Sequence, residues 1–489
     1  MNTLKFNIYI APPITIFYNT LAFSLLTRRK NLMTQNVKKE PINLLVDPVS
    51  ETLKRMTIPM IYGMILLMTF NLVDTFFVGL LGTQPLAAIS FTFPITFTVI
   101  SLTIGLGIGA SAVIARSLGE GDNKTAKCAA TSAFILTAAI VGFLAFLGFW
   151  FTDVIFKLLG ASDDLLPLIR DYMDYWFLGS IFLIGPMIGN SVLRASGDTK
   201  TPSLVMGLGG VINAISDPIF IFGFGPFPAM GIKGAAIATL CSWAVGLTYI
   251  LYIVGYKKHL IHTTFVFVKT FLVSSKSILR IGLPAAGANM LTPIAAAILT
   301  AIAATYGEAT VAAFGVGSRI ESIACLVLLA LSMTLPPFIS QNFGAGNMQR
   351  VEQSYFTSIT FVLVWQVFVY ILLALSAPWI ADIFAKEQAV ADIIKLFIWI
   401  LPLGYGLQGV IILTNSSFNA LHKPMMSLGL SIIRLFVCYV PLAYIGSELF
   451  GIEGFFVGAL LGNIVMAFVS YKVFMKQFKV EVLKAEAVS

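Results

Sequence analysis

Apolar stretches long enough to cross a membrane recur about twelve times along this 489-residue chain. A bilayer crossing needs about 20 predominantly apolar residues in a helix, and every stretch exceeds that length. Glycine and proline inside them are tolerated, because neighbouring helices satisfy the backbone groups that they free. The pattern therefore predicts an all-α integral membrane protein with twelve transmembrane helices. The stretches lie near 56–81, 86–115, 127–151, 173–195, 203–223, 231–256, 281–305, 310–340, 355–377, 394–420, 425–446 and 452–475.

Composition agrees with this pattern, since 58% of the residues are hydrophobic and only 11% are charged. A soluble protein of this composition would leave large apolar patches in water. The 31 basic residues outnumber the 23 acidic ones, and this excess could indicate a nucleic-acid partner. Its distribution favours membrane topology instead, and we expect no nucleic acid.

Lys and Arg gather in alternate loops, which fixes the predicted orientation. The opposite loops hold only Lys157, Arg170, Lys233, Lys386 and Lys395. Because cytoplasmic loops carry the basic excess, both termini are expected in the cytoplasm of a bacterial inner membrane. The basic set comprises Lys54, Arg55, Arg116, Lys124, Lys127, Arg194, Lys200, Lys257, Lys258, Lys269, Lys276, Arg280, Arg350, Lys423, Lys472, Lys476, Lys479 and Lys484.

Cysteines and histidines give no sign of a metal site or an enzyme. The four cysteines lie singly in apolar stretches, and the three histidines fall in predicted loops. No HExxH or paired CxxC motif occurs, and no nucleophile sits beside a base. We therefore expect no metal, no cofactor and no catalytic activity.

An internal repeat relates the two halves of the chain at a constant offset of 225 residues. Six spans per half is an even number, so the halves point the same way, as in transporters that bind substrate between two repeats. The sequence "GIKG" at 231–234 matches "GIEG" at 451–454 at a slightly different offset. The pairs at this offset include Ser50 and Ser275, Arg55 and Arg280, Pro59 and Pro284, Gly82 and Gly307, Gly119 and Gly344, and Gly121 and Gly346.

The repeat and the loops predict the domain organisation. "FNIYIAPPITIFYNTLAFSLL" followed by "RRK" resembles a weak signal sequence or an extra span without a convincing cleavage site. We favour an upstream start codon, with Met33 as the working start. The expected parts are an N-terminal extension (1–49), an N-lobe (50–256), a cytoplasmic linker (257–280), a C-lobe (281–475) and a cytoplasmic tail (476–489).

Two aspartates within the spans are the main candidates for function, because ionisable residues at membrane depth are costly. Asp74 in span 1 and Asp217 in span 5 both lie roughly 10 Å below the outer surface, at 1.5 Å per residue. Asn71 and Asn213 share a helix face with them, and Pro218 frees backbone carbonyls beside Asp217. Such carboxyl groups can bind either a proton or a cation, as an antiporter requires. A permanently neutral, structural Asp is the alternative.

The second half lacks this acidic pair but has its own polar cluster. At the repeat offset, Leu299 and Leu442 stand where Asp74 and Asp217 lie. Glu321 and Arg434 are both predicted near the midplane, with Arg319 close by. We favour a buried ion pair that fixes helix packing; a second coupling site is the alternative.

Glycines at positions 105, 107 and 109 form a GxGxG string inside span 2. No strand precedes the string, so it does not predict a nucleotide site. Small residues let membrane helices approach closely, and we expect close helix packing here.

The motifs "LVDTFFVGLLG", "SLGEGD" and "RASGDTKTP", with twelve spans in two repeats, resemble the MATE family of multidrug and toxic-compound exporters. The resemblance covers about residues 50 to 475. It implies two six-helix lobes around a central cleft and export of cationic, often aromatic compounds in exchange for H⁺ or Na⁺. Asp74 with "NAISDP" is similar to the proton-coupled DinF-like branch.

Site residues carried over from that branch fall on matching positions. Its coupling residues fall on Asp74, Asp217 and Asn213, and its hinge proline on Pro59. Asn71, Asn190 and Met206, together with both aspartates, are the implied substrate contacts. The branch's span-6 threonine has no clear match, because Ala235 occupies the place and Thr239 lies one turn on.

The resemblance implies a secondary active multidrug antiporter that works by alternating access, driven by an ion gradient without a cofactor. The family's sodium branch carries acids in spans 7 and 10, and none occurs there in this chain. Proton coupling is therefore favoured, with Na⁺ at Asp74 and Asp217 left open. We expect a monomer surrounded by lipid. A lipid-linked saccharide flippase of a related branch is the alternative function, although such proteins usually carry a cationic cavity.

Overall fold

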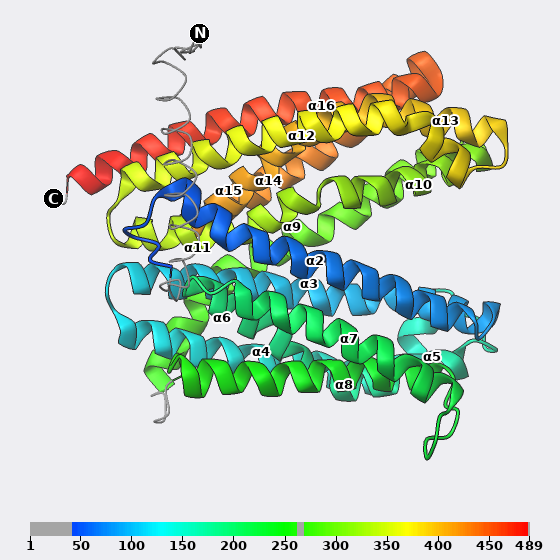
Figure 1. Cartoon of the computed structure of the whole chain (residues 1–489), viewed down its shortest axis with the longest axis horizontal. Helices are drawn as coiled ribbons and strands as arrows, with labels where there is room; N and C mark the ends of the chain where they lie inside the picture. The colour runs from blue at the N-terminus through cyan, green and yellow to red at the C-terminus, as the bar shows by residue number, and fades with distance from the viewer. Residues whose placement is uncertain (1–41, 262–267, 488–489) are drawn as a thin grey trace, which may run out of the picture. The chain divides into compact units, whose positions relative to one another are not determined.

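The computed structural model describes residues 42–261 and 268–487, and these residues fold almost entirely into helices (Figure 1). Residues 43–489 form one unit. The predicted start at Met33 and nearly all of the N-terminal extension lie outside the described residues.

The first half of the chain supplies six membrane crossings. Two of them are composite: one joins α5 to α6 through short 3₁₀ and π-helical turns, and another continues from α8 into the π-helical turn η3. The helices are α2 (Val49–Gly79), α3 (Thr83–Gly119), α4 (Asn123–Leu158), α5 (Leu166–Gly179), η1 (Ser180–Leu183), η2 (Gly185–Gly189), α6 (Asn190–Ala195), α7 (Lys200–Phe222), α8 (Ile232–Leu251) and η3 (Tyr252–Lys257).

The second half repeats this series. Its helices are α9 (Val268–Ala304), α10 (Glu308–Ala324), α11 (Leu326–Gly344), α12 (Met348–Phe384), α13 (Gln388–Ile400), η4 (Leu401–Gly404), α14 (Tyr405–Ala420), α15 (Pro424–Ile432), η5 (Ile433–Tyr439) and α16 (Val440–Glu486).

The twelve predicted crossings are all present. Eleven helical segments in the described residues meet the length and hydropathy expected of a span, and the last of them, Pro424–Glu486, contains two crossings. A kink separates these two at Gly451, whose φ of 63° is a left-handed value that suits glycine. The eighth crossing consists of α10 and α11, with a break at Cys325 that the apolar pattern of 310–340 did not predict.

Helices α9 and α16 extend beyond their predicted spans. The former begins at Val268, inside the expected linker, and the latter runs to Glu486, inside the expected tail. Both extensions are more polar than the spans. Helix length in this protein is therefore not limited to the thickness of the bilayer.

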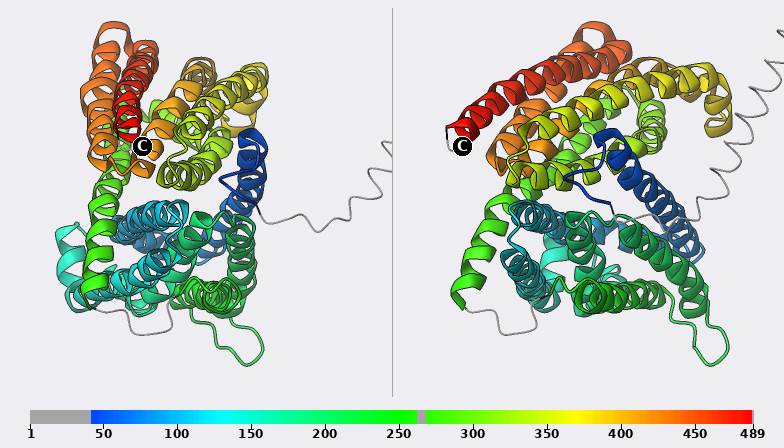
Figure 2. Two further views of the ribbon diagram at one scale, coloured as in Figure 1. Left: turned by 90° about the vertical axis from the view of Figure 1, so that its left-hand side faces the viewer. Right: turned by 60° about the vertical axis from the view of Figure 1, so that its left-hand side comes forward.

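The two halves form two helix groups, α2–α8 and α9–α16 (Figures 1 and 2). The first helix of each half also contacts the other half. Helix α2 packs on α11, and α9 packs on α3 and α4. These crossings join the groups at one end of the molecule.

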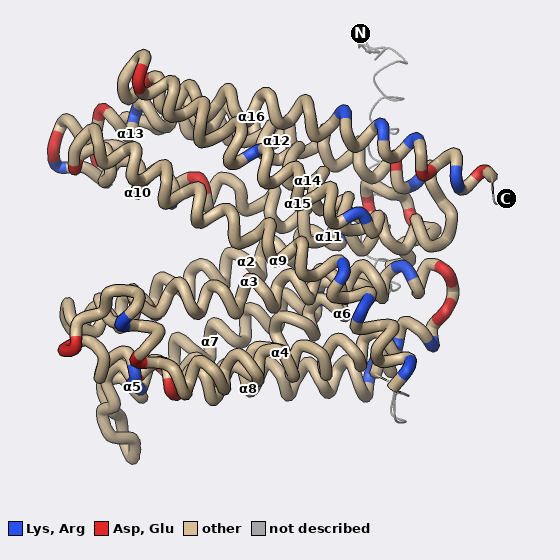
Figure 3. Tube along the Cα trace, turned by 180° about the vertical axis from the view of Figure 1, so that it is seen from behind, with Lys and Arg blue, Asp and Glu red and all other residues tan. Residues whose placement is uncertain are grey.

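Basic side chains concentrate at this same end (Figure 3). We call it the basic end: α3, α6 and α11 finish here, and α4, α7 and α12 begin here. Arg116 and Arg194 lie in the last turns of α3 and α6. At the opposite end, basic residues pair with acids, as in Arg170 with Asp153 at 2.7 Å.

The glycine string of α3 packs closely on other helices, as predicted. A Cβ at Gly105 would lie 2.5 Å from the carbonyl oxygen of Gly282 in α9, and one at Gly109 would overlap the carbonyl oxygen of Ile278. Gly107 faces the hydroxyl group of Ser191 in α6, which leaves no room for a Cβ. The α3–α9 crossing is thus a contact of backbone on backbone, which larger side chains would exclude.

The turns at the basic end explain two of the sequence motifs. The last residue of "SLGEGD", Asp122, caps α4 and accepts a hydrogen bond of 2.9 Å from the Thr125 N–H. The Thr125 hydroxyl also donates to this carboxyl, and the two hydrogen bonds lower the pKa of Asp122. In "RASGDTKTP", Asp198 accepts a matching bond from the Thr201 N–H at 3.1 Å. Each aspartate therefore stabilises the first turn of the helix that follows it.

Candidate functional site

Asp74 on α2 and Asp217 on α7 are brought into contact within the first half. These two helices pack along each other, and the two carboxyl groups lie close enough to interact directly. Two carboxylates are both acceptors, so a hydrogen bond between such groups requires a proton on one of them. The side chain of Asp217 is fully buried, whereas that of Asp74 is partly exposed.

Asn213 completes the pair from one turn earlier on α7. Its amide Nδ2 donates to Asp217 Oδ1 at 3.2 Å. In the described part of the chain, no amide or hydroxyl donor reaches the buried Asp217 Oδ2. That oxygen is therefore free to accept a proton or to bind a cation.

Tyr172 lies near this site, and the sequence reasoning did not name it. It lies on α5, close enough to interact electrostatically with both carboxyl groups. Its neighbour Asp171 pairs with Lys233 at 3.1 Å, and Asp174 Oδ1 is buried without a hydrogen-bond partner in the described residues. Tyr172 lies just before the predicted span 173–195, among charged residues, so no pattern in the sequence indicated such a role.

The predicted substrate contacts occupy varied environments. Asn71, one turn before Asp74, is exposed. Asn190 is buried at the start of α6, and its Oδ1 accepts no hydrogen bond from the described residues. Met206 on α7 is half-buried. No hydrogen bond within the described ranges links Asn190 to the aspartates, and the role of these residues stays a prediction.

The predicted hinge lies in an unbroken helix. α2 continues through Pro59, and the Pro59 carbonyl accepts a hydrogen bond of 2.5 Å from the Ser203 hydroxyl of α7. The nearby Gly63 also faces Ser203, since a Cβ there would lie 2.9 Å from its Cα. Bending at Pro59 would therefore have to disturb this α2–α7 contact.

The polar cluster of the second half does not form the ion pair that the sequence favoured. Glu321 on α10 accepts a hydrogen bond of 3.0 Å from Gln408 Nε2 on α14. The Arg434 guanidinium lies 5.9 Å from the centre of the Tyr439 ring, and no described ion pair joins it to Glu321 within 4.0 Å. Their charges interact over a longer distance. Arg319 is exposed.

Comparison with known proteins decides the family. The MatE family model matches the chain twice, over residues 59–219 and 284–445. The chain belongs to the MATE family. The two matches start 225 residues apart, so they confirm the repeat offset found in the sequence.

Relatives and solved structures in the MATE family cover nearly the whole chain. The FAD transporter of Shewanella oneidensis is 40% identical over 433 residues, which are 88% of this chain and 96% of the relative. The probable multidrug resistance protein NorM of Thermotoga maritima is 24% identical over 422 residues, covering 85% and 90%. The Vibrio cholerae MATE transporter VcmN in the bent form superposes with a TM-score of 0.84 at 33% identity, covering 89% and 98%.

Membership confirms the predicted class of protein. MATE proteins are multidrug and toxic-compound efflux transporters rather than enzymes, and this chain is a multi-pass membrane transporter of that family. Assignment to the DinF-like branch stays a prediction, as do the coupling ion and the substrate.

Proposed function

We propose that this MATE protein is an H⁺-coupled exporter in which Asp74 and Asp217 form the coupling site. The observation that carries the proposal is the close approach of these two carboxyl groups, of which Asp217 is fully buried and accepts a hydrogen bond from Asn213. Two adjacent carboxyl groups can share one proton, bind a second one or release the first. The repeat places Leu299 and Leu442 at the equivalent positions of the second half, so coupling is confined to the first half.

Exchange follows from competition at this pair. Cargo leaves when incoming protons neutralise both carboxyl groups and remove the charge that holds a cation. Exchange of one H⁺ for one monovalent cation moves no net charge, so the pH difference drives it by about 1.4 kcal/mol per unit. Na⁺ is the alternative coupling ion, because carboxylate and amide oxygens of Asp74, Asp217 and Asn213 also suit a hard cation.

The proposed orientation puts the basic end in the cytoplasm. The positive-inside rule supports it, as Lys and Arg concentrate where α3, α6 and α11 finish (Figure 3). Both termini then face the cytoplasm of a bacterial inner membrane. Transport proceeds by alternating access, in which the two helix groups open to one side at a time.

Two cargo classes have support. Cationic, often aromatic compounds fit the acidic pair, and multidrug resistance proteins are among the relatives. FAD is the second candidate because the Shewanella relative of that name is 40% identical. FAD carries a negatively charged pyrophosphate. In the second half, Arg434 and Arg319 supply positive charge, and Arg434 Nε is buried without a hydrogen-bond partner in the described residues.

A lipid-linked saccharide flippase is less favoured. Its cargo carries a pyrophosphate, as FAD does, but the relatives compared above are named for transport of FAD or for multidrug resistance. Deletion of the gene would separate these functions. An exporter mutant accumulates a fluorescent cation or flavin, whereas a flippase mutant has a cell-wall defect.

Transport by purified protein in proteoliposomes tests the proposal. Efflux of an ethidium-type cation and of FAD is measured under imposed pH gradients and, separately, Na⁺ gradients. We expect a pH gradient to drive export of one of these cargoes, and Asp74→Asn to abolish the dependence on pH. Coupled export that is unchanged in Asp74→Asn would refute the site, whereas coupling to Na⁺ alone would reassign the ion.

A further inference from the structure

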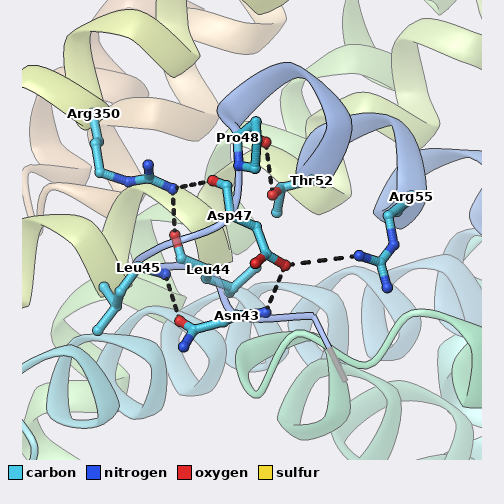
Figure 4. Close-up of polar contacts among 8 residues, drawn as sticks. All are labelled: Asn43, Leu44, Leu45, Asp47, Pro48, Thr52, Arg55 and Arg350. Atoms are coloured by element: carbon cyan, nitrogen blue, oxygen red, sulfur yellow. Dashed lines mark hydrogen bonds and ion pairs between the residues drawn. The ribbon is translucent and has the colours of Figure 1, made fainter. Parts of the chain in front are cut away.

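Residues 43–48, just before α2, lie between the two halves at the basic end (Figure 4). The Leu44 side chain is only 2% exposed and faces Gly197 of the first half, where a Cβ would be 3.4 Å from Leu44 Cγ. The Leu44 carbonyl faces the second half and accepts a hydrogen bond of 3.0 Å from Asn342 Nδ2 of α11. One residue thus contacts both halves.

Arg350 of α12 strengthens this contact. Its Nη2 donates to the carbonyl oxygens of Leu44 at 3.0 Å and Asp47 at 2.7 Å. Its Nε donates to Asn342 Oδ1 at 2.9 Å, and its guanidinium lies 5.4 Å from the centre of the Phe338 ring. A planar guanidinium fixed on three sides holds the two carbonyls in one geometry.

The segment is in turn fixed to α2, so the contact reaches the helix that carries Asp74. Asp47 Oδ2 lies 3.7 Å from Arg55 of α2 and accepts a hydrogen bond of 3.0 Å from the Asn43 N–H. The Thr52 hydroxyl donates to the Pro48 carbonyl at 2.9 Å. Movement of α2 away from the second half would therefore pull directly on Arg350.

Further along α2, Thr57 and Thr334 of α11 share a hydrogen bond of 2.8 Å between their hydroxyls. At the repeat offset of 225, their equivalents are Gly282 and Gly109, which meet in the α3–α9 crossing. The α2–α11 and α3–α9 contacts are thus equivalent by the repeat but differ in chemistry. Polar side chains form the α2–α11 contact, whereas the backbone of glycine residues forms the α3–α9 contact.

The Arg350 contact belongs to the first of these contacts only. Thr125 stands at the position equivalent to Arg350, and Ser117 at that equivalent to Asn342. Hydrogen bonds between polar side chains can be replaced by water when a contact opens. Backbone packing of glycines has no such replacement, because separation leaves apolar surface uncovered.

We propose that residues 43–48, with Arg350 and Asn342, form a latch that keeps the basic end closed, and that this end opens by separation of α2 from α11 while the α3–α9 crossing stays closed. The proposal rests on the alternating access inferred above. Release of the latch then becomes the step that admits cargo at the basic end.

Site-directed labelling tests the latch without any cargo, so a wrong cargo assignment leaves the result readable. In full-length protein without its four native cysteines, Met56→Cys reports on α2 and Ile281→Cys on α9; both native side chains are buried. An impermeant maleimide is applied from the basic end. We expect Arg350→Ala to raise labelling at position 56 roughly tenfold, the loss expected from a charge-assisted hydrogen bond, and to leave position 281 unchanged.

Arg170→Ala is the matched control, because it removes an arginine–carboxylate pair within the first half at the opposite end. It should change neither labelling rate. If Arg350→Ala does not fold, Asn342→Ala tests the same Leu44 carbonyl. Unchanged labelling at position 56 in the folded variant, or an equal rise at position 281, would overturn the proposal.

A disulfide provides an independent test. Thr57→Cys with Thr334→Cys places two thiols where the hydroxyls now lie within 2.8 Å, a separation that suits a disulfide after small adjustment. Oxidation should prevent labelling from the basic end even in the Arg350→Ala background, and reduction should restore it. Labelling that persists in the oxidised protein would show that the basic end opens elsewhere.

Discussion

His422 Nε2 lies 3.3 Å from the backbone oxygen of Ala112, so the turn after α14 contacts α3 of the other half. The side chain is half-buried, and burial together with nearby Arg116 lowers the pKa of His422 to about 4. Arg280 contributes in the same direction, and Glu120 opposes it. At neutral pH the imidazole is therefore uncharged.

This pKa predicts how stability depends on pH. An unfolded histidine has a pKa of about 6.5, so between pH 6.5 and 4 the unfolded chain binds more protons than the folded one. The free energy of unfolding should therefore fall as the pH drops through this window, by up to about 1.4 kcal/mol per unit. Thermal unfolding of the purified protein against pH measures it, with His422→Gln as a reference that cannot titrate. Equal losses in both proteins would contradict the assignment to His422.

Substitution of Asp74 separates coupling from stability. In Asp74→Asn the amide can donate to Asp217 without a titratable proton, and we expect a stable protein without coupled export. Asp74→Leu copies the residue at the equivalent position 299 and leaves the buried Asp217 Oδ2 without a partner. It should be less stable than Asp74→Asn by about 1–3 kcal/mol. Thermal unfolding distinguishes them, and equal stability would argue against the carboxyl contact.

The α3–α9 crossing should not tolerate a methyl group. Gly109→Ala puts a Cβ onto the Ile278 carbonyl oxygen, and we expect a loss of about 1–3 kcal/mol from overpacking. Gly142→Ala in α4 is the control, because a Cβ there has no neighbour within 4 Å; alanine should stabilise that helix by up to about 1 kcal/mol. Denaturation of both variants measures the difference. A neutral Gly109→Ala would mean that the helices can move apart at little cost.

The Glu321 cluster is expected to support packing rather than coupling. Glu321→Gln keeps a side chain that can accept from Gln408 at the same place, so pH-driven export should remain within a few-fold of wild type. Proteoliposome efflux measures this, beside Asp74→Asn as the uncoupled reference. Loss of pH dependence in Glu321→Gln would instead identify a second coupling site.

The sequence predicted most of the fold because membrane depth leaves a periodic signal. Long apolar runs located the crossings, and glycines at 105, 107 and 109 indicated the close contact of α3 that the structure contains. The break at Cys325 was not predictable, since the apolar run continues through it. Side-chain pairing was harder: the depth of Asp74 and Asp217 placed them near each other, but depth could not reveal Tyr172 on a third helix.

The latch shows a different limit of sequence reasoning. Leu44 and Asp47 contribute backbone carbonyls, which every residue has, so nothing in their side chains marks them. Arg350 counted only as one more basic loop residue in the prediction of topology. Its specific role depends on three separate segments meeting, which no local pattern encodes.

The two repeats are alike in their helices, yet Leu299 and Leu442 show that only one retains acidic groups at these positions. After a gene duplication, such a division separates two selective pressures. One copy must conserve its response to the ion, while the other can accumulate substitutions that change which molecules it accepts. Divergence of cargo under a constant energy source is the evolutionary outcome that this architecture favours.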